Sequence, residues 1–528
     1  MKGNRIVAID KKPFITFLDR YILIIILLAF LAYSVFVVAA RSFWIDESMV
    51  ALAIVQSGIS PFEPLVAHNQ VSPWGFVMIT RLVEALFGAG DLQFRIPGIL
   101  VYLTAVGYFS QFIKRRYGLL VASAITITML ANPLLLRYST EFKHYLYEFS
   151  FVIFLLISYF EMKENITRAK YIYTFSLGLS LFFGVSIIFV VASIFTTEML
   201  SRLKYSFKTG ILSHWLLLNL VFFTLFAIWY FASVTPNLKY NLLNYPHIYN
   251  VDLGPGNLLN LNHWAKVLVV IITSILIPQS IALLVCLLAV VYLRIKKKIT
   301  LNRPIFLIPV LVYLFIYLLN FAGFYPILLD RHLLFILPTF YLLFAYALSQ
   351  FTAIFNKNMF RLIAFFIVVG FSALTLADYH IHNQFFFQEI KPVLKTIKTS
   401  DRVFLYFSAQ PGYDWYKYSL YPNLPEPVNP HVNAATGLRI PLEEMEANLP
   451  KLITEPGAWP TIALLTTTDN SIIYEQYLES QIKAAGKSLL VISHRSGIQL
   501  RDLLKESCGL KGLEVKRGAA VYEVDCRQ

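Results

Sequence analysis

The segment Tyr21–Ala40, YILIIILLAFLAYSVFVVAA, is followed at once by Arg41–Ser48, RSFWIDES, and together they indicate the fold. The first segment has no charged residue and is long enough to cross a bilayer as one helix. Asp46 and Glu47 therefore come directly after a membrane span, among aromatic residues. Removing a carboxylate from water is costly unless it is paired or used in chemistry. Two interpretations follow: these residues begin a helix through Ser48–Gln56, or they belong to a catalytic site.

The composition is that of a polytopic membrane protein. Hydrophobic residues make up 57% of the chain and charged residues 14%, and the mean hydropathy is +0.62. A soluble globular protein has about a quarter charged residues. The net charge of +14 comes from basic clusters between apolar segments, which is typical of membrane topology and does not predict nucleic-acid binding. Three cysteines exclude a disulfide-rich scaffold and a cysteine-ligated zinc site.

Apolar segments predict about eleven membrane spans, with residues 1–378 forming the membrane domain. The segment 171–200 is interpreted as two short spans with a pivot at Gly184, because basic residues flank it on both sides. The predicted spans lie near residues 21–40, 96–113, 119–136, 144–161, 171–184, 185–200, 211–232, 267–292, 304–322, 332–352 and 360–378.

Basic residues predict which loops face the cytoplasm. Clusters lie at residues 2–20, 114–116, 163–170, 202–208, 294–303 and 357–361, whereas the other loops carry only scattered lysines and arginines. Because cytoplasmic loops are enriched in Lys and Arg, the N-terminus is predicted inside and the C-terminus outside. The outer loop 41–95 contains Ser72–Phe87, which is predicted to be a helix lying in the membrane interface.

Residues 379–528 carry no predicted span and are predicted to form an extracytoplasmic α/β domain. Cys508 and Cys526 both lie in it, either as a disulfide or as two free thiols. Helices are predicted at 386–397, 413–420, 442–453 and 472–485, and strands at 402–407, 461–465 and 489–492.

Ionisable residues gather at the predicted outer ends of the spans. They are Arg41, Asp46, Glu47, His68, Glu141, Lys143, His144, Asp330, Arg331 and His332. The spans themselves are nearly free of charge, which disfavours an ion pathway. Groups at one interface fit chemistry on a lipid-borne substrate whose head reaches the surface. Cations beside a carboxylate suit a phosphate, and the carboxylate can act as a base on a hydroxyl group.

The chain resembles the polyprenyl-phosphate-sugar-dependent glycosyltransferases of the GT-C fold class. It is most similar to bacterial relatives of the protein O-mannosyltransferases and of the lipid A aminoarabinose transferases. The motifs are Trp44-x-Asp46-Glu47, His68-Asn69-Gln70-Val71-Ser72-Pro73, Arg95-Ile96-Pro97-Gly98, Asn132-Pro133, Ser139-x-Glu141-x-Lys143-x-Tyr145, Arg331-His332-…-Pro338 and Asp401-x-Val403-x-Leu405-Tyr406. Two positions depart from the family pattern: many relatives carry a Lys or a double proline near Gln70, and the aminoarabinose transferases usually carry an Asp near Glu141.

The resemblance implies an inverting glycosyltransferase, transferring a hexosyl or pentosyl group, in the bacterial inner (plasma) membrane. Its donor would be a polyprenyl-phosphate-linked sugar, and its acceptor a hydroxyl group on a protein, lipid or polysaccharide at the outer face. By this analogy Asp46 is the base and Glu47 shapes the site. Arg331 and Lys143 stabilise the leaving phosphate, and Glu141 orients sugar or acceptor. His68, Gln70 and Tyr145 complete the predicted donor-binding set.

Other interpretations stay open at this point. A lipid-linked-sugar flippase or another transporter would need charges along the spans, and a glycan ligase or polymerase would use a polymeric donor. Arg95 and Arg137 are most simply explained as span ends whose side chains extend to the membrane surface. His68 and His144 are interpreted as hydrogen-bonding residues. The sequence predicts no cofactor and leaves dependence on a divalent metal open.

Overall fold

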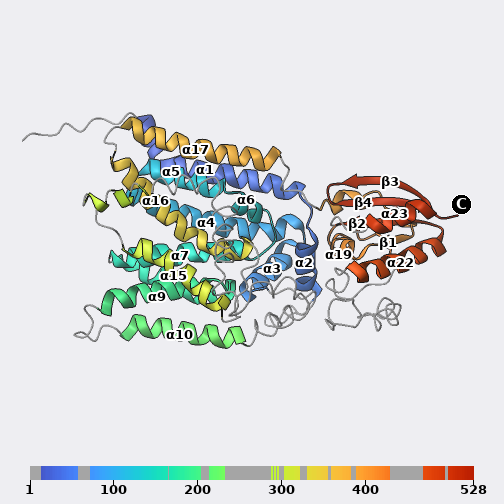
Figure 1. Ribbon diagram of the computed structural model, residues 1–528, viewed down its shortest axis with the longest axis horizontal. Helices are drawn as coiled ribbons and strands as arrows, with labels where there is room; N and C mark the ends of the chain where they lie inside the picture. Colours follow the sequence, from blue (N-terminus) through green and yellow to red (C-terminus); the bar gives the residue numbers. More distant parts are fainter. Residues whose placement is uncertain are drawn as a thin grey trace, which may run out of the picture.

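The structure is a computed structural model. It describes residues 13–56, 72–164, 166–203, 213–231, 287–288, 290–292, 294–296, 303–321, 330–354, 358–381, 388–428, 468–493 and 498–527. A helical part comes first and an α/β part follows from residue 388. Figure 1 shows that the α/β part lies at one end of the helices, next to α2 (Ile45–Gln56) and α3 (Trp74–Phe87).

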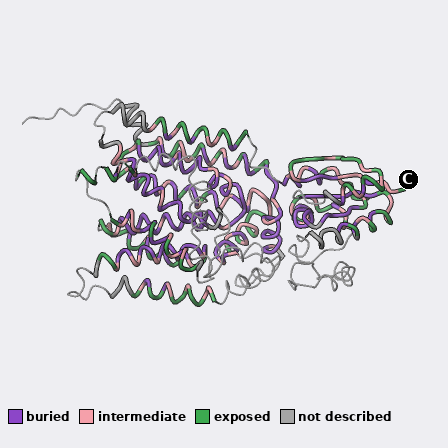
Figure 2. Tube along the Cα trace, viewed as in Figure 1, coloured by how far each residue is buried: buried purple, intermediate pink, exposed green. Residues whose placement is uncertain are grey.

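The helical part consists of apolar helices that run mostly side by side (Figure 1). Besides α2 and α3 they are α1 (Pro13–Ala40), α4 (Asp91–Tyr117), α5 (Leu119–Leu130), α6 (Pro133–Ser139), α7 (Tyr145–Lys163), α8 (Thr167–Phe183), α9 (Ile187–Leu203), α10 (Ser213–Trp229), α15 (Arg303–Phe321), η7 (Asp330–Ile336), α16 (Leu337–Ile354) and α17 (Asn358–Ile381). Figure 2 shows the inner helices buried and exposed residues along the outer ones, such as α10 and α17. Large exposed residues there are apolar, including Leu217, Ile228, Phe366 and Leu374, as expected for a lipid-facing surface.

Four helices within the described residues are long and apolar enough to cross a membrane: Tyr21–Ala40, Asp91–Tyr117, Tyr145–Lys163 and Leu333–Phe351. The bent pair α5 and α6 adds a fifth, and several shorter apolar helices accompany them. Helices occupy every predicted span except 267–292, most of which lies outside the described residues. The prediction of a polytopic helical protein is confirmed, whereas the number of crossings stays a prediction.

The bend between α5 and α6 directs the following segment, residues 140–144, to the site described below. The two helices meet at 63°, separated by Ala131 and Asn132. The Asn132 side chain accepts hydrogen bonds from the backbone N–H groups of Leu134 (3.0 Å) and Leu135 (3.1 Å), and Pro133 occupies the first helical position. An N-cap asparagine followed by proline starts a helix in a new direction. As a result α6 ends where the turn 140–144 leads into α7.

The predicted pivot at Gly184 is present, because α8 ends at Phe183 and α9 begins at Ile187. The Glu148 side chain of α7 fills the break, and its Oε1 accepts from the N–H of Val185 at 3.0 Å. A Cβ atom on residue 184 would overlap the Glu148 carboxyl group. The glycine is therefore required by the close approach of this side chain.

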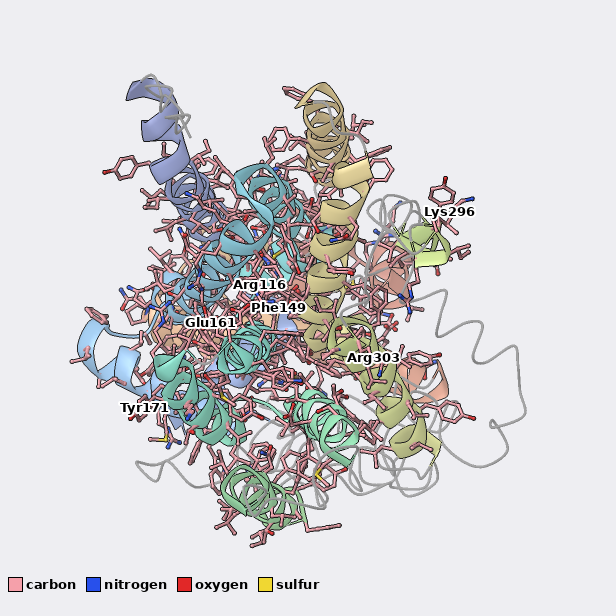
Figure 3. All side chains as sticks on the ribbon, turned by 90° about the vertical axis from the view of Figure 1, so that its left-hand side faces the viewer. Arg116, Phe149, Glu161, Tyr171, Lys296 and Arg303 are labelled. Atoms are coloured by element: carbon pink, nitrogen blue, oxygen red, sulfur yellow. A yellow bond between two sulfur atoms is a disulfide. The ribbon has the colours of Figure 1, made fainter. Side chains whose placement is uncertain are left out.

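Figure 3 looks along the helices from the end opposite the α/β part, where Arg116, Glu161, Lys296 and Arg303 are labelled. At this end Arg115 pairs with Glu161, which belongs to α7. These cations belong to clusters that the sequence predicts to be cytoplasmic. The structure thus separates them from the α/β part by the length of the helices, as that prediction requires, while the side on which each terminus lies stays a prediction.

The α/β part contains a four-stranded sheet in the order β1-β2-β4-β3. Strands β1 and β2 pair in parallel, and β4 pairs antiparallel with both β2 and β3. Its elements are α18 (Ile390–Leu394), β1 (Val403–Leu405), η8 (Phe407–Ala409), α19 (Gln410–Ser419), α22 (Thr468–Ala485), β2 (Lys487–Ser493), α23 (Ile498–Ser507), β3 (Gly509–Lys516) and β4 (Ala519–Asp525). The sequence analysis did not predict the β3–β4 hairpin. The predicted helix 442–453 and strand 461–465 lie outside the described residues.

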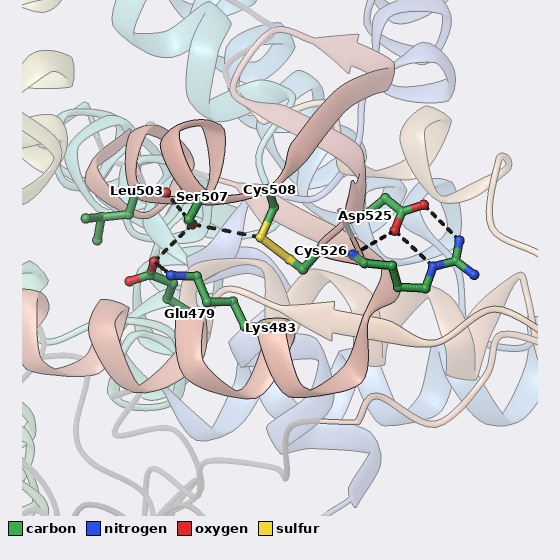
Figure 4. Close-up of a disulfide and its surroundings, with 8 residues drawn as sticks. Glu479, Lys483, Leu503, Ser507, Cys508, Asp525 and Cys526 are labelled. Carbon is green, nitrogen blue, oxygen red and sulfur yellow. Dashed lines mark hydrogen bonds and ion pairs between the residues drawn. A yellow bond between two sulfur atoms is a disulfide. The ribbon is translucent and has the colours of Figure 1, made fainter.

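Cys508 and Cys526 form a disulfide, which resolves the two alternatives left open by the sequence (Figure 4). The bond joins the residue before β3 to the residue after β4, so it ties the open ends of the hairpin together. Ser507 of α23 donates a hydrogen bond to Glu479 of α22 at 3.2 Å beside it.

Candidate active site

Two short segments face each other at the end of the helices nearest the α/β part. The first, 41–47, joins α1 to the first turn of α2. The second, 140–144, joins α6 to α7. Arg41 connects them, because its Nη1 donates to the Thr140 carbonyl oxygen at 3.1 Å and to Thr140 Oγ1 at 2.8 Å. The motifs Trp44-x-Asp46-Glu47 and Glu141-x-Lys143, far apart in sequence, are thus adjacent in space.

Glu47 lies at the centre of this arrangement and is fully buried. Arg95 Nη2 donates to both carboxylate oxygens at 2.8 Å, and its Nε donates to Oε1 at 3.0 Å. The backbone N–H groups of Phe142 and Trp44 donate to the same carboxylate. Arg41 Nη2 lies 3.5 Å from Oε2. Such a carboxylate holds two segments together and is shielded from solvent.

Arg95 corrects a sequence-based prediction. Its side chain does not extend to the membrane surface, since the residue is only 2% exposed. Besides binding Glu47, it donates to the carbonyl oxygens of Arg41 (3.2 Å) and Ser42 (3.1 Å). The guanidinium fork suits this pattern, because its five donors lie in one plane. The local sequence Arg95-Ile96-Pro97-Gly98 does not reveal a partner that lies 48 positions earlier.

Glu141 is the second buried carboxylate. It accepts from Arg137 Nε at 2.8 Å and from Arg41 Nη2 at 3.4 Å. Its other oxygen, Oε2, is buried and has no hydrogen-bond partner among the described residues. A buried carboxylate oxygen normally has a donor, so Oε2 is an unsatisfied acceptor inside the site. Arg137 has one-third of its side chain exposed, as expected at the end of a span. Its pairing with Glu141 was not predicted from the sequence.

Asp46 is the more accessible carboxylate of the site, and it lies beside the buried Lys143. The Asp46 side chain is 26% exposed, and its Oδ2 lies 4.0 Å from Lys143 Nζ. Lys143 Nζ also lies 6.0 Å from the centre of the Trp44 ring, within the range of a cation–π contact. Side chains of consecutive helix residues point about 100° apart. Asp46 therefore faces the site, whereas Glu47 faces the protein interior. The two neighbouring carboxylates therefore have different surroundings.

The structure describes the other predicted site residues only in part. Tyr145 begins α7 and packs edge-on against Tyr138, with ring centres 5.3 Å apart. Arg331 belongs to η7, which packs on α6 and α7, and its side chain lies outside the described atoms. His68 and Gln70 lie outside the described residues. The structure thus brings Asp46, Glu47, Glu141 and Lys143 together.

The described cluster combines cations and carboxylates with an excess of positive charge. Arg41, Arg95, Arg137 and Lys143 face Asp46, Glu47 and Glu141. No group of three or more His, Cys, Asp or Glu side chains in the described ranges is arranged to hold a metal ion. An excess positive charge next to an accessible carboxylate can bind an anion and accept a proton at neighbouring positions.

Comparisons with known proteins agree with this architecture. The chain is similar to the crystal structure of ArnT from Cupriavidus metallidurans in the apo state, with a TM-score of 0.53, 12% sequence identity and coverage of 95% of this chain and 97% of that chain. It also matches the structure of that ArnT bound to undecaprenyl phosphate, with a TM-score of 0.47, 12% identity, and coverage of 96% and 98%. No family model and no curated protein matches the sequence. ArnT is a lipid A aminoarabinose transferase of the GT-C class, so the predicted GT-C fold is confirmed.

Proposed function

We propose that this protein is an integral-membrane glycosyltransferase that transfers a sugar from a polyprenyl-phosphate donor to a hydroxyl acceptor at the outer face of the membrane. The observation that carries the proposal is the partly exposed Asp46 beside the buried cation Lys143, on segments held by the buried Glu47–Arg95 and Glu141–Arg41 contacts. Its GT-C fold, shared with the ArnT transferase, supports the same class of activity. The transferred group would be a hexosyl or pentosyl residue.

In the proposed reaction Asp46 accepts the proton of the acceptor hydroxyl as its oxygen attacks the anomeric carbon. The bond between that carbon and the phosphate oxygen breaks, and the polyprenyl phosphate leaves with the electron pair. Attack opposite the leaving group inverts the anomeric configuration. A partly exposed carboxylate is suited to this task, since a general base must be ionised and must reach the acceptor.

Lys143 would stabilise the charge that develops on the departing phosphate, and Arg331 of η7 would assist from the neighbouring helix. Glu141, whose side chain is as buried as that of Glu47, would orient the sugar or acceptor through the cations that it binds, Arg41 and Arg137. Glu47 has no exposed atom that substrate could reach. Its role is to hold the segments that carry Asp46 and Lys143, which agrees with a shaping role.

A transporter of lipid-linked sugars is less well supported. Glu161 and Glu198 are buried in the helices, but they pair with Arg115 and Lys163 at the end away from the site. These two carboxylates form ion pairs there, and Glu148, also buried in α7, accepts from the N–H of Val185, so these carboxylates do not line a path along the helices.

The test is a transfer assay with purified protein in nanodiscs and a radiolabelled polyprenyl-phosphate sugar, with the acceptor supplied in an envelope extract. We expect Asp46→Asn to lower the rate by about 10²–10⁴, in protein that is still folded at the assay temperature. Asp502→Asn, an exposed carboxylate in α23, is the matched control and should retain activity. Normal transfer by Asp46→Asn would refute the assignment of the base, and transport of intact donor without cleavage would favour a flippase.

A further inference from the structure

The α/β part is hydrogen-bonded to the backbone that leads into α2. The Tyr416 hydroxyl group of α19 accepts from the N–H of Phe43 at 2.6 Å. The Gln388 side-chain oxygen accepts from the N–H of Ile45 at 2.8 Å. Ile45 is the first residue of α2, where backbone N–H groups lack partners within the helix, and Phe43 lies two residues before it. Here the acceptors come from more than 340 residues later in the chain.

A third contact fixes Ser42. Its hydroxyl donates to Glu389 Oε2 at 3.2 Å and accepts from the backbone N–H of Lys391 at 3.2 Å. Both partners flank the start of α18. Together with Tyr416 and Gln388, they contact the stretch immediately before Asp46, as expected from the position of α2 beside α19 in Figure 1.

Asp91, the first residue of α4, completes the junction from the membrane side. Its Oδ2 accepts from the Tyr416 hydroxyl at 2.8 Å and from Lys391 Nζ at 3.1 Å, and its Oδ1 accepts from Trp415 Nε1 at 2.9 Å. Burial raises the pKa of Tyr416 well above its usual value, so the hydroxyl keeps the proton that it donates to Asp91. Arg95, one turn further along α4, binds the Arg41 and Ser42 carbonyl groups.

Aromatic rings extend the contact to the second site segment. The Trp415 ring stacks on Phe43 with centres 5.1 Å apart, and Phe43 stacks on Phe142 with centres 5.5 Å apart. Phe142 immediately precedes Lys143. Trp415 of α19 thus contacts Phe43 directly and is linked through the Phe43 ring to Phe142, the neighbour of Lys143.

We propose that the α/β part is a positioning element of the transfer site and that Tyr416 is its principal positioning residue. This inference rests on the proposed function. By accepting from the N–H of Phe43 while donating to Asp91, Tyr416 fixes the backbone that leads into α2 relative to α4. The placement of Asp46 against Lys143 then depends on a domain that supplies neither residue. Reaction rates are sensitive to such placement, because a shift of about 1 Å can cost on the order of 100-fold.

The test compares Tyr416→Phe with Tyr413→Phe. Tyr413 lies on the same helix and is equally buried, but its hydroxyl donates to the Pro425 carbonyl oxygen within the α/β part. The purified full-length variants are assayed for sugar transfer, for melting temperature and for backbone hydrogen exchange in the peptide covering residues 41–48. A role confined to stability would lower the melting temperature and leave the turnover of folded protein unchanged.

For Tyr416→Phe we expect faster exchange in this peptide and a fall in kcat of about 10- to 100-fold, with the donor KM nearly unchanged. The melting temperature should fall, because the Phe43 N–H and Asp91 each lose a partner. Tyr413→Phe should match the wild type in exchange and in kcat. If exchange in Tyr416→Phe is unchanged, or if it rises while kcat stays normal, the proposal is wrong. If Tyr416→Phe does not fold, the same measurements on Gln388→Met test the proposal independently, because this variant removes the acceptor for the N–H of Ile45.

The two proposals fail in different ways. A wild-type protein that transfers no sugar from any polyprenyl-phosphate donor would refute the proposed function. The exchange measurement would still decide whether Tyr416 holds residues 41–48, because it requires no substrate. Active wild-type protein with insensitive Tyr416→Phe and Gln388→Met variants would refute only the positioning role.

Discussion

Replacing Glu47 by glutamine should destabilise the protein far more than replacing its neighbour Asp46 by asparagine. Glu47→Gln preserves the size of the side chain and removes its charge. Arg95 would then be left 2% exposed without its carboxylate partner, and an amide NH₂ group would face its donors. Arg41, only 1% exposed, would lose the nearby carboxylate as well.

The magnitude follows from burial. Breaking a buried ion pair by removing one partner costs about 3–5 kcal/mol, because an uncompensated charge stays inside the protein. Domains are typically stable by about 5–15 kcal/mol, so this is a large fraction of the total. Asp46, with 26% of its side chain exposed and its partner 4.0 Å away, should cost less than Glu47, but more than the roughly 1 kcal/mol of a surface pair because Lys143 is only 6% exposed.

The assay is thermal unfolding of the purified variants, followed by tryptophan fluorescence in one detergent. The double variant Glu47→Gln/Arg95→Gln removes both charges and should be less destabilised than the sum of the two single variants. A melting temperature for Glu47→Gln as high as that of Asp46→Asn would refute the reasoning. Additive effects in the double variant would show that Glu47 and Arg95 are not energetically coupled.

Three further predictions follow from the geometry. Lys143→Met should lower kcat by about 10²–10³ and Lys143→Arg should recover part of it, because the leaving phosphate loses a cation; a normal kcat for Lys143→Met would exclude this role. Burial raises the pKa of Glu389 above its usual 4.5, so stability is highest below that pH and falls as the carboxyl ionises at higher pH. Glu389→Gln should therefore raise the melting temperature more at pH 8 than at pH 4, and equal shifts at both would contradict this. Replacing both Cys508 and Cys526 by alanine removes a cross-link between residues 18 positions apart, so the free energy of unfolding of the α/β part should fall by about 3 kcal/mol. Urea unfolding measures this loss, and wild-type protein whose stability does not change on reduction would contradict it.

Much of the architecture could be predicted from the sequence because its causes are local. An uncharged stretch such as Tyr21–Ala40 must be helical in lipid, where backbone groups have no other partners. The pivot at Gly184 was predicted, whereas the predicted span 119–136 ran through the Asn132-Pro133 pair, which in the structure starts a new helix. Hydropathy and the positions of basic residues therefore predicted the helical part, and the motifs indicated the GT-C fold that the comparison with ArnT confirms.

The functions of the individual charged residues depended on the tertiary structure. Asp46 and Glu47 are adjacent in sequence, yet only the rotation of α2 places Glu47 on Arg95 and leaves Asp46 partly exposed. The contact of Tyr416 with the N–H of Phe43 links positions 373 residues apart. The sequence determined where helices begin and which residues carry charge, because these properties depend on neighbouring residues. Only the packing of distant segments decided which charges are buried in pairs, because the partner of a buried group is chosen by the three-dimensional arrangement.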